Sequence, residues 1–313
     1  MSGLSEWLIL YCHPMNRQRI TLQILATTAL VSATTQLIAA PPIEDAFTIT
    51  GTLENRAIDE ASGLQAGANG VFYTHNDGKR DVFVIDDTGR DLGAFKLDGA
   101  KNRDWEDITR VPYGNGHLLV ISDSGDNQAR YNKIRLYFFP EPAAGEYHRD
   151  HDVLHRTKVT YPDGPRDVES AAWDSSSGQI LLLSKRDQPP RLYGVPLERA
   201  LAEDELEAGF LGELKGLRPP TRADLLMSKR GRWVSQPTAL DISPDGRRAA
   251  VLTYRSLYLY SRQDGESWAE AFQRAPQEYL GPPGTHDEAV SFSLDGRSVY
   301  VTTERRPAPV YRL

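Results

Sequence analysis

The sequence predicts an all-β protein that folds as a five-bladed β-propeller. Two observations carry this prediction. From Phe47 onward, β-rich runs bounded by Gly, Pro and Asp recur, and the one helical pattern of any length is Leu197–Ala208. In addition, one unit of several short strands recurs five times, and repeats of about 40 to 50 residues built this way are typical of propeller blades. The 313 residues, 40% hydrophobic and 25% charged, have the composition of an ordinary globular protein.

Each unit begins with an acidic or polar residue followed by small and apolar ones, which predicts the innermost strand of a blade. The five starts are EASGL at Glu60, EDITRV at Glu106, ESAAWD at Glu169, TALDIS at Thr238 and EAVSFS at Glu288. A tight Gly turn follows each start and leads to a second strand, and a third strand follows. The order of these signals is the same in all five units.

Four units also contain a fourth strand, at Leu92–Gly99, Arg156–Gly164, Gly209–Gly216 and Ala275–Gly281, whereas the fifth unit ends at Leu313 without one. We expect the N-terminal segment Ala46–Leu53 to supply the missing strand, because closing the ring removes the free sheet edges. A sixth blade within Glu198–Ser235 is the alternative.

The N-terminal residues predict export. Met15 offers a second start, Arg17 and Arg19 form a basic region, and Ile20–Ala33 is apolar and followed by small residues. We interpret residues 1–40 as a signal peptide that starts at Met15, and residues 41–313 as a single propeller domain. An uncleaved anchor is the alternative, although the stretch is shorter than the roughly 20 apolar residues of a membrane span.

Composition excludes several functional classes. The single cysteine, Cys12, allows neither an internal disulfide nor a thiolate metal site. The formal charge of −7 argues against a nucleic-acid partner. The motifs of serine hydrolases, zincins and P-loop enzymes do not occur. We therefore expect a periplasmic or secreted monomer without disulfides and, after signal cleavage, without a stable membrane span.

The inner strands of a propeller line its central channel, so acidic residues there should meet. If Glu106, Glu169 and Glu288 face the channel, the residues two positions earlier face it nearer the mouth; these are Asp104, Asp167 and His286. Blades one and four offer Glu60 or Ser62, and Thr238. Crowded carboxylates repel one another unless they are protonated or share a cation. An all-oxygen set favours Ca²⁺, and the alternative is that these residues pair with backbone amides or arginines and bind no metal.

The loops after the second strands, and the segment Leu217–Ser235, are rich in cations. A basic rim above an anionic metal well would hold a phosphate or another multiply charged anion, because Arg and the metal can share its oxygens. The candidate binding residues are Asp77, Asp126, Lys185, Arg186, Arg255 and Arg305.

The blade starts resemble those of the calcium-activated nucleotidases, the secreted apyrase family of five-bladed propellers. The matching stretches are Glu60–Leu64, Trp105–Ile108, Glu169–Trp173, Pro237–Leu240 and Glu288–Phe292. The resemblance implies a central Ca²⁺ with ligands from Ser62, Glu106, Glu169, Thr238 and Glu288. A looser similarity to bacterial phytase-like secreted propellers, in DWEDI and the SPDG turns, points to phosphoester chemistry.

Together these patterns predict a Ca²⁺-dependent hydrolase of a phosphorylated or other anionic small molecule. Asp104 or Asp167 would be the general base, with His286 a third candidate, and the rim cations would neutralise developing charge. The alternative is a non-catalytic binding or scaffold propeller in which Ca²⁺ only holds the blades together.

Overall fold

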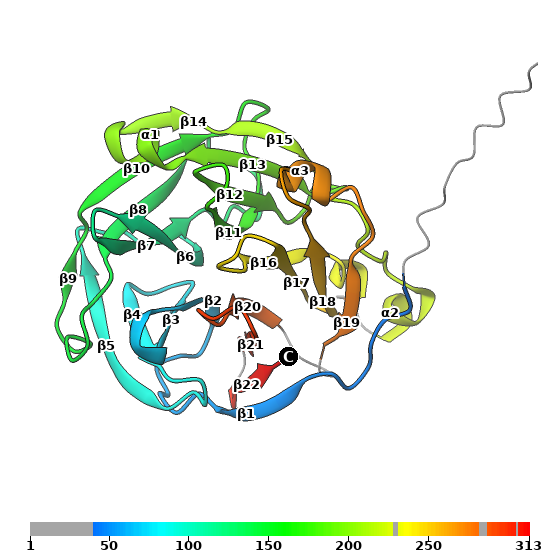
Figure 1. Ribbon diagram of the computed structural model, residues 1–313, viewed down its shortest axis with the longest axis horizontal. Helices are drawn as coiled ribbons and strands as arrows, with labels where there is room; N and C mark the ends of the chain where they lie inside the picture. The colour runs from blue at the N-terminus through cyan, green and yellow to red at the C-terminus, as the bar shows by residue number, and fades with distance from the viewer. Residues whose placement is uncertain (1–39, 228–230, 282–286, 305) are drawn as a thin grey trace, which may run out of the picture. The chain divides into compact units, whose positions relative to one another are not determined.

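The computed structural model describes residues 40–227, 231–281, 287–304 and 306–313, all within one compact unit. Five sheets surround a central axis, and each contributes its first strand to the inside of the ring (Figure 1). Among the described residues, the helices are too short or too polar to cross a membrane. The predicted five-bladed propeller is confirmed.

The blades follow one another in chain order. Blade one contains β2 (Ala61–Ala66), β3 (Phe72–Asn76), β4 (Asp81–Ile85) and β5 (Asp91–Asp98). Blade two contains β6 (Trp105–Tyr113), β7 (Gly116–Asp123), β8 (Ile134–Pro140) and β10 (His155–Thr160). Blade three contains β11 (Val168–Asp174), β12 (Gln179–Ser184), β13 (Arg191–Pro196) and β15 (Gly209–Glu213). Blade four contains β16 (Pro237–Ile242), β17 (Arg248–Thr253), β18 (Ser256–Ser261) and β19 (Gln277–Leu280).

Blade five is completed by the N-terminal strand, as predicted. Its own strands are β20 (Asp287–Phe292), β21 (Val299–Thr303) and β22 (Pro309–Arg312), and β1 (Thr48–Thr52) pairs antiparallel with β22. Thr48 lies opposite Arg312, so the first and the last strand of the described chain meet on one blade. This pairing gives β22 a neighbour on its outer side.

The segment 198–235 does not form a sixth blade, so that alternative is wrong. It contains most of α1 (Leu197–Ala202), then β14 (Glu205–Glu207), β15, α2 (Arg222–Met227) and the 3₁₀ turn η2 (Gly231–Trp233). The predicted helix therefore stops six residues early. Residues 205–207 instead pair parallel with β10, which buries Leu206. A second short parallel addition, β9 (His151–Asp152), extends blade one. The remaining short helices are η1 (Ala68–Gly70) and α3 (Trp268–Ala271).

The apolar core lies between neighbouring blades. In β12, Leu182 packs with residues of blade two, such as Leu136, whereas Leu181 packs with residues of blade four, such as Val251. Both faces of the strand are therefore buried, which explains why its sequence is the continuous apolar run ILLL rather than an alternating pattern.

Polar side chains on the inner strands also join neighbouring blades. Each accepts a hydrogen bond from a backbone N–H on the inner strand of the next blade. The pairs are Gln65 with Arg110 (2.9 Å), Asp107 with Ala171 (2.8 Å), Asp241 with Phe292 (2.7 Å) and Ser291 with Ala66 (2.9 Å). The sequence analysis missed these residues. The only signal was that Asp107 and Asp241 each directly precede an Ile in their inner strands.

Candidate metal centre

Every inner strand contains an irregularity at the same position. The register of β6 against β7 shifts between Trp105 and Asp107, which leaves Glu106 as the extra residue of a β-bulge. A bulge changes the direction of a side chain and is common beside functional sites. The five bulged residues are Ser62, Glu106, Glu169, Thr238 and Glu288. They are all buried, and they occupy the five positions at which the sequence predicts metal ligands.

Three carboxylates converge on the channel side of blades two and three. One oxygen from each of Glu106, Asp167 and Glu169 lies within 4.8 Å of the others, and all three residues are buried. Glu106 lies on β6 and Glu169 on β11, whereas Asp167 directly precedes β11. The structure thus brings two predicted ligands together with a residue predicted as the general base.

Asp104 borders this cluster. A Cβ on Gly125 would overlap carboxylate oxygens of both Glu106 and Asp104, so these two groups lie against one backbone position that only glycine fits. The buried carboxylate of Asp123 positions the turn before β6, because it accepts hydrogen bonds from the backbone N–H groups of Arg103 and Asp104 at 2.9 Å. Burial, followed by the charges of Asp167 and Asp123, raises the pKa of Asp104.

A lysine ammonium lies inside the same site. Lys185 forms a buried ion pair with Glu169, with side chains 7% and 5% exposed, and its Nζ lies 5.0 Å from the centroid of the Tyr254 ring. Burial alone lowers the pKa of Lys185, but the charges of Glu169 and Glu288 outweigh it and raise this pKa well above its usual value. Lys185 therefore stays charged and offsets one of the carboxylates.

Negative charge is in excess at this site. The five carboxylates of Asp104, Glu106, Asp167, Glu169 and Glu288 face three cations, which are Lys185, Arg186 and, beside Asp104, Arg103. Burial, together with the charge of Glu169, raises the pKa of Glu106 and of Glu288 well above the ordinary value. Such a group of carboxyls must bind protons or a further cation. We call these five residues the axial well.

The donor set of the axial well fits a hard cation. Its groups are carboxylate oxygens, with the hydroxyls of Ser62 and Thr238 beside them, and the residues that the structure describes include no cysteine. Ca²⁺ accepts six to eight irregular oxygen ligands, whereas Zn²⁺ sites are usually built from nitrogen and sulfur. An oxygen-ligated divalent cation is therefore the metal that these residues suit.

The other predicted ligands lie around the cluster of Glu106, Asp167 and Glu169 and have partners of their own. The Ser62 hydroxyl donates to Glu106 Oε2 at 3.4 Å, and the Thr238 hydroxyl donates to the backbone oxygen of Asp287 at 2.8 Å. Glu288 shares a hydrogen bond with Glu304. Each oxygen retains further acceptor capacity, so these contacts do not prevent ligation.

Asp167 is already engaged at both oxygens. Its Oδ1 accepts from the backbone N–H of Asp126 at 2.8 Å, and its Oδ2 forms a 2.5 Å ion pair with Arg186 Nε. Arg186 also donates to Asn127. These contacts fix the carboxylate in place, which suits a ligand better than a group that must gain and release a proton.

The remaining predicted binding residues are distributed around the mouth. Arg255 pairs with Asp224 at 2.8 Å and donates to backbone oxygens of the loop before β16. Asp126 Oδ2 accepts from the Tyr131 N–H at 2.6 Å. Burial and a hydrogen bond with Glu60 raise the pKa of Asp77 to about 7. His286 and Arg305 lie outside the described residues.

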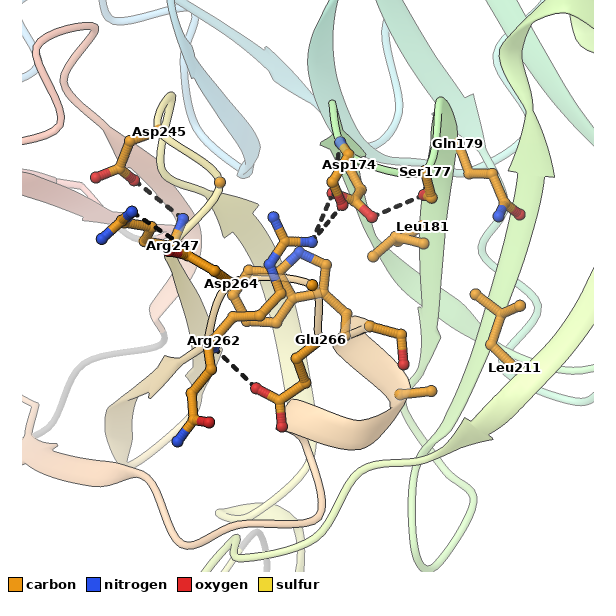
Figure 2. A pocket seen from close by; sticks show the side chains of 17 residues that line it. Asp174, Ser177, Gln179, Leu181, Leu211, Asp245, Arg247, Arg262, Asp264 and Glu266 are labelled. Carbon is orange, nitrogen blue, oxygen red and sulfur yellow. Dashed lines mark hydrogen bonds and ion pairs between the residues drawn. The ribbon is translucent and has the colours of Figure 1, made fainter.

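A hollow of about 660 Å³ lies between blades three and four, at the ends of their inner strands that are opposite to the axial well. Figure 2 shows Arg262 directed toward Asp174, with which it forms an ion pair at 3.2 Å. Its guanidinium also lies over the Trp268 ring, 4.9 Å from the centroid. Arg247 pairs with Asp264 in the same hollow. These charged groups satisfy one another, in contrast to those of the axial well.

Comparisons with known proteins identify no family. No family model matches the chain, and no curated protein matches it. Among solved structures it is similar to the PQQ-bound form of an aldose sugar dehydrogenase from Streptomyces coelicolor. The two share 12% identity over 87% of this chain and 99% of that chain, with a TM-score of 0.44. At that distance the likeness does not bear on function, and the resemblance to calcium-activated nucleotidases stays a prediction.

Proposed function

We propose that the axial well binds one Ca²⁺ and that the protein is a metal-dependent hydrolase of a phosphorylated or other anionic small molecule. The observation that carries this proposal is the convergence of Glu106, Asp167 and Glu169 within 4.8 Å in a buried site. The five carboxylates of the well also outnumber the three cations nearby, Lys185, Arg186 and Arg103. These three residues are the primary ligands, and Ser62, Thr238 and Glu288 surround them.

The chain's own residues supply the other requirements of hydrolysis. A bound Ca²⁺ would polarise a phosphoryl oxygen and acidify a bound water. Asp104 is the best general base, because its pKa is raised and its side chain is only half-buried and reachable from the mouth. Lys185 holds a fixed positive charge beside the ligands, which stabilises negative charge developing on the substrate.

We further propose that the propeller works outside the cytoplasm, in the periplasm or as a secreted protein. Arg17, Arg19 and the apolar stretch Ile20–Ala33 support this location. Mass spectrometry of the native protein should find a mature N-terminus near residues 33–41.

A non-catalytic propeller is the second candidate. The proposed ligands belong to two neighbouring blades, with Glu106 on β6 and Glu169 on β11, so a bound cation would also join those blades. Arg255 and Asp126 at the mouth are engaged in contacts within the loops. The first fact suits a cation with a purely structural role, and the second suits a mouth that binds no substrate.

A substrate screen separates the two candidates. The purified mature chain is assayed on nucleotides, inositol hexakisphosphate, simple phosphomonoesters and lactones, with Ca²⁺ and with EDTA. We expect turnover of at least one class, its loss in EDTA, and a fall of about 100-fold or more in Asp104→Asn. Asp98→Asn, an exposed carboxylate on β5, is the matched control. Ca²⁺ binding without turnover of any class would favour the non-catalytic propeller.

A further inference from the structure

A pocket of about 310 Å³ opens beside the axial well, between loops of blades three and four. Lys185 forms part of its wall and also pairs with Glu169 of the well, so the pocket and the well share a side chain. Gln236, on another part of the wall, directly precedes β16 and is two residues from the bulged Thr238. The pocket therefore adjoins the candidate metal centre through Lys185.

The walls of this pocket are largely apolar. Four prolines line it, in the pairs Pro189–Pro190 and Pro219–Pro220, together with Leu214 and Leu217. Proline rings are rigid, so the surface loses little conformational entropy when a ligand covers it. The volume lies at the lower end of the range of roughly 300–1,000 Å³ found for small-molecule sites. Such a pocket suits a compact apolar group.

The charge around the pocket is positive. Lys215 and Arg232 line it and are exposed, and neither has a carboxylate partner among the residues that the structure describes. The one lining carboxylate, Asp187, is offset by Arg166 in a 2.8 Å ion pair. The pocket thus combines apolar walls with cations that have no carboxylate partner among the described residues, although the Arg232 guanidinium lies over the Trp233 ring. An organic anion with an apolar body complements both features.

We propose that this pocket is the subsite for the organic group of the substrate. The substrate is then a small phosphomonoester with an aromatic or other apolar group, not a densely charged polyphosphate. This inference rests on the proposed hydrolase function, because it assumes that the anionic group reaches Lys185 and the axial well. The apolar group lies between the proline pairs, and Lys215 and Arg232 attract the anion.

Binding of two unreactive phosphonates tests the subsite without any need for turnover. Calorimetry compares phenylphosphonate with methylphosphonate, which carries the same anion without the apolar body, in Ca²⁺ and again in EDTA. We expect phenylphosphonate to bind at least about tenfold more tightly in one or both conditions. Equal affinities in both conditions, or absence of binding, would overturn the subsite.

Three variants locate the binding. Lys215→Ala and Arg232→Ala should each weaken both phosphonates several-fold, because each removes an attracting charge. Gln188→Trp, at an exposed position of the wall, should narrow the pocket and weaken phenylphosphonate alone. Arg297→Ala removes the same charge from a side chain that is 86% exposed, in the turn at the far end of β20, and should change neither affinity. Wild-type affinities in all three pocket variants would place the binding elsewhere and overturn the proposal.

The same variants separate failure of the subsite from failure of the hydrolase proposal. If an aryl phosphomonoester is hydrolysed and its KM is unchanged in all three, the hydrolase stands and the subsite is wrong. If no substrate is hydrolysed but phenylphosphonate binds selectively and the variants weaken it, the subsite stands as a binding site and the hydrolase is wrong. Hydrolysis with a raised KM and an unchanged kcat in the variants supports both.

Discussion

Gly125 is the residue on which the geometry of the axial well depends most directly. A Cβ at this position would overlap carboxylate oxygens of the buried Glu106 and the half-buried Asp104. Gly125→Ala should therefore displace at least one of them and weaken Ca²⁺ binding by about tenfold or more, measured by calorimetry. Gly116→Ala, where the nearest atom to a new Cβ is 4.0 Å away, is the control. Equal Ca²⁺ affinity in both variants would contradict the placement of these carboxylates.

Asp241 should make the stability of the propeller dependent on pH. Burial raises its pKa to about 7, against roughly 3.9 in an unfolded chain. Between these values the folded protein holds a proton that the unfolded chain has released, so this residue's contribution to the free energy of unfolding falls as pH rises from about 4 to 7. The slope is at most about 1.4 kcal/mol per pH unit.

Asp241→Asn removes that titration. The free energy of unfolding of this variant, measured relative to that of wild type, should therefore increase between pH 5 and pH 7. The substitution also changes the group that accepts from the backbone N–H groups of Ile242 and Phe292, but the cost of that change does not depend on pH. Urea unfolding in EDTA measures the difference, and Asp264→Asn, at a side chain 85% exposed, is the control. A difference that does not change with pH would show that Asp241 has the same pKa in both states.

At the scale of elements, β1 is the strand that closes the ring. It pairs with β22 of blade five, and the Thr50 hydroxyl donates to the backbone oxygen of Asp87 in blade one at 2.7 Å. A chain beginning at Glu54 would expose the edge of β22 and lose several hydrogen bonds of about 1 kcal/mol each.

We therefore expect the chain beginning at Glu54 to melt roughly 10 °C below a chain beginning at Ala40 and to associate through the exposed edge. Circular dichroism melting and size-exclusion chromatography measure the two effects. Equal melting temperatures and equal elution volumes would show that β1 does not stabilise the closure.

The regular strands of the blades were predictable from sequence, because each repeat presents the same succession of polar start, Gly turn and apolar run. The missing fourth strand of the last repeat even located β1. Very short elements were not predictable. β9 has two residues and β14 has three, which is too few for a periodic signal, and β14 lies within a pattern that predicts a helix.

The candidate site was predictable as a set of positions but not as a set of contacts. The repeated strand starts located four of the five bulged residues and left Glu60 or Ser62 open for blade one, where the family resemblance implied Ser62. Asp167 was assigned as a base because a sequence pattern shows which residues face a channel and not which oxygens meet. In the sequence, Arg255 lies in a short loop with no acidic residue beside it, which predicts an unpaired cation. Its partner Asp224 is 31 residues away and approaches it only when the loop before β16 folds back.

At the scale of the whole molecule, the axial well is where blades two, three and five affect one another. Its carboxylates come from blades two, three and five. They approach and repel one another only when the ring has closed, so this repulsion destabilises the folded protein and not the unfolded chain. A cation that binds this arrangement and not the unfolded chain must stabilise the folded ring by RT ln(1 + [L]/Kd).

Calcium should therefore raise the melting temperature of the whole propeller. At a free Ca²⁺ concentration of 100 times Kd the gain is about 2.7 kcal/mol, which corresponds to a rise of several degrees. Glu106→Gln should reduce this rise because it removes a ligand. The same substitution should also increase the melting temperature in EDTA, because it relieves the repulsion between Glu106 and the charges of Glu169 and Asp104. Glu198→Gln, on the exposed side of α1, should leave both melting temperatures unchanged.

A neutral substitution that only damaged packing would lower stability in both conditions. The opposite signs in EDTA and in Ca²⁺ therefore identify a cation site, and a melting temperature that responds to neither reagent would refute it.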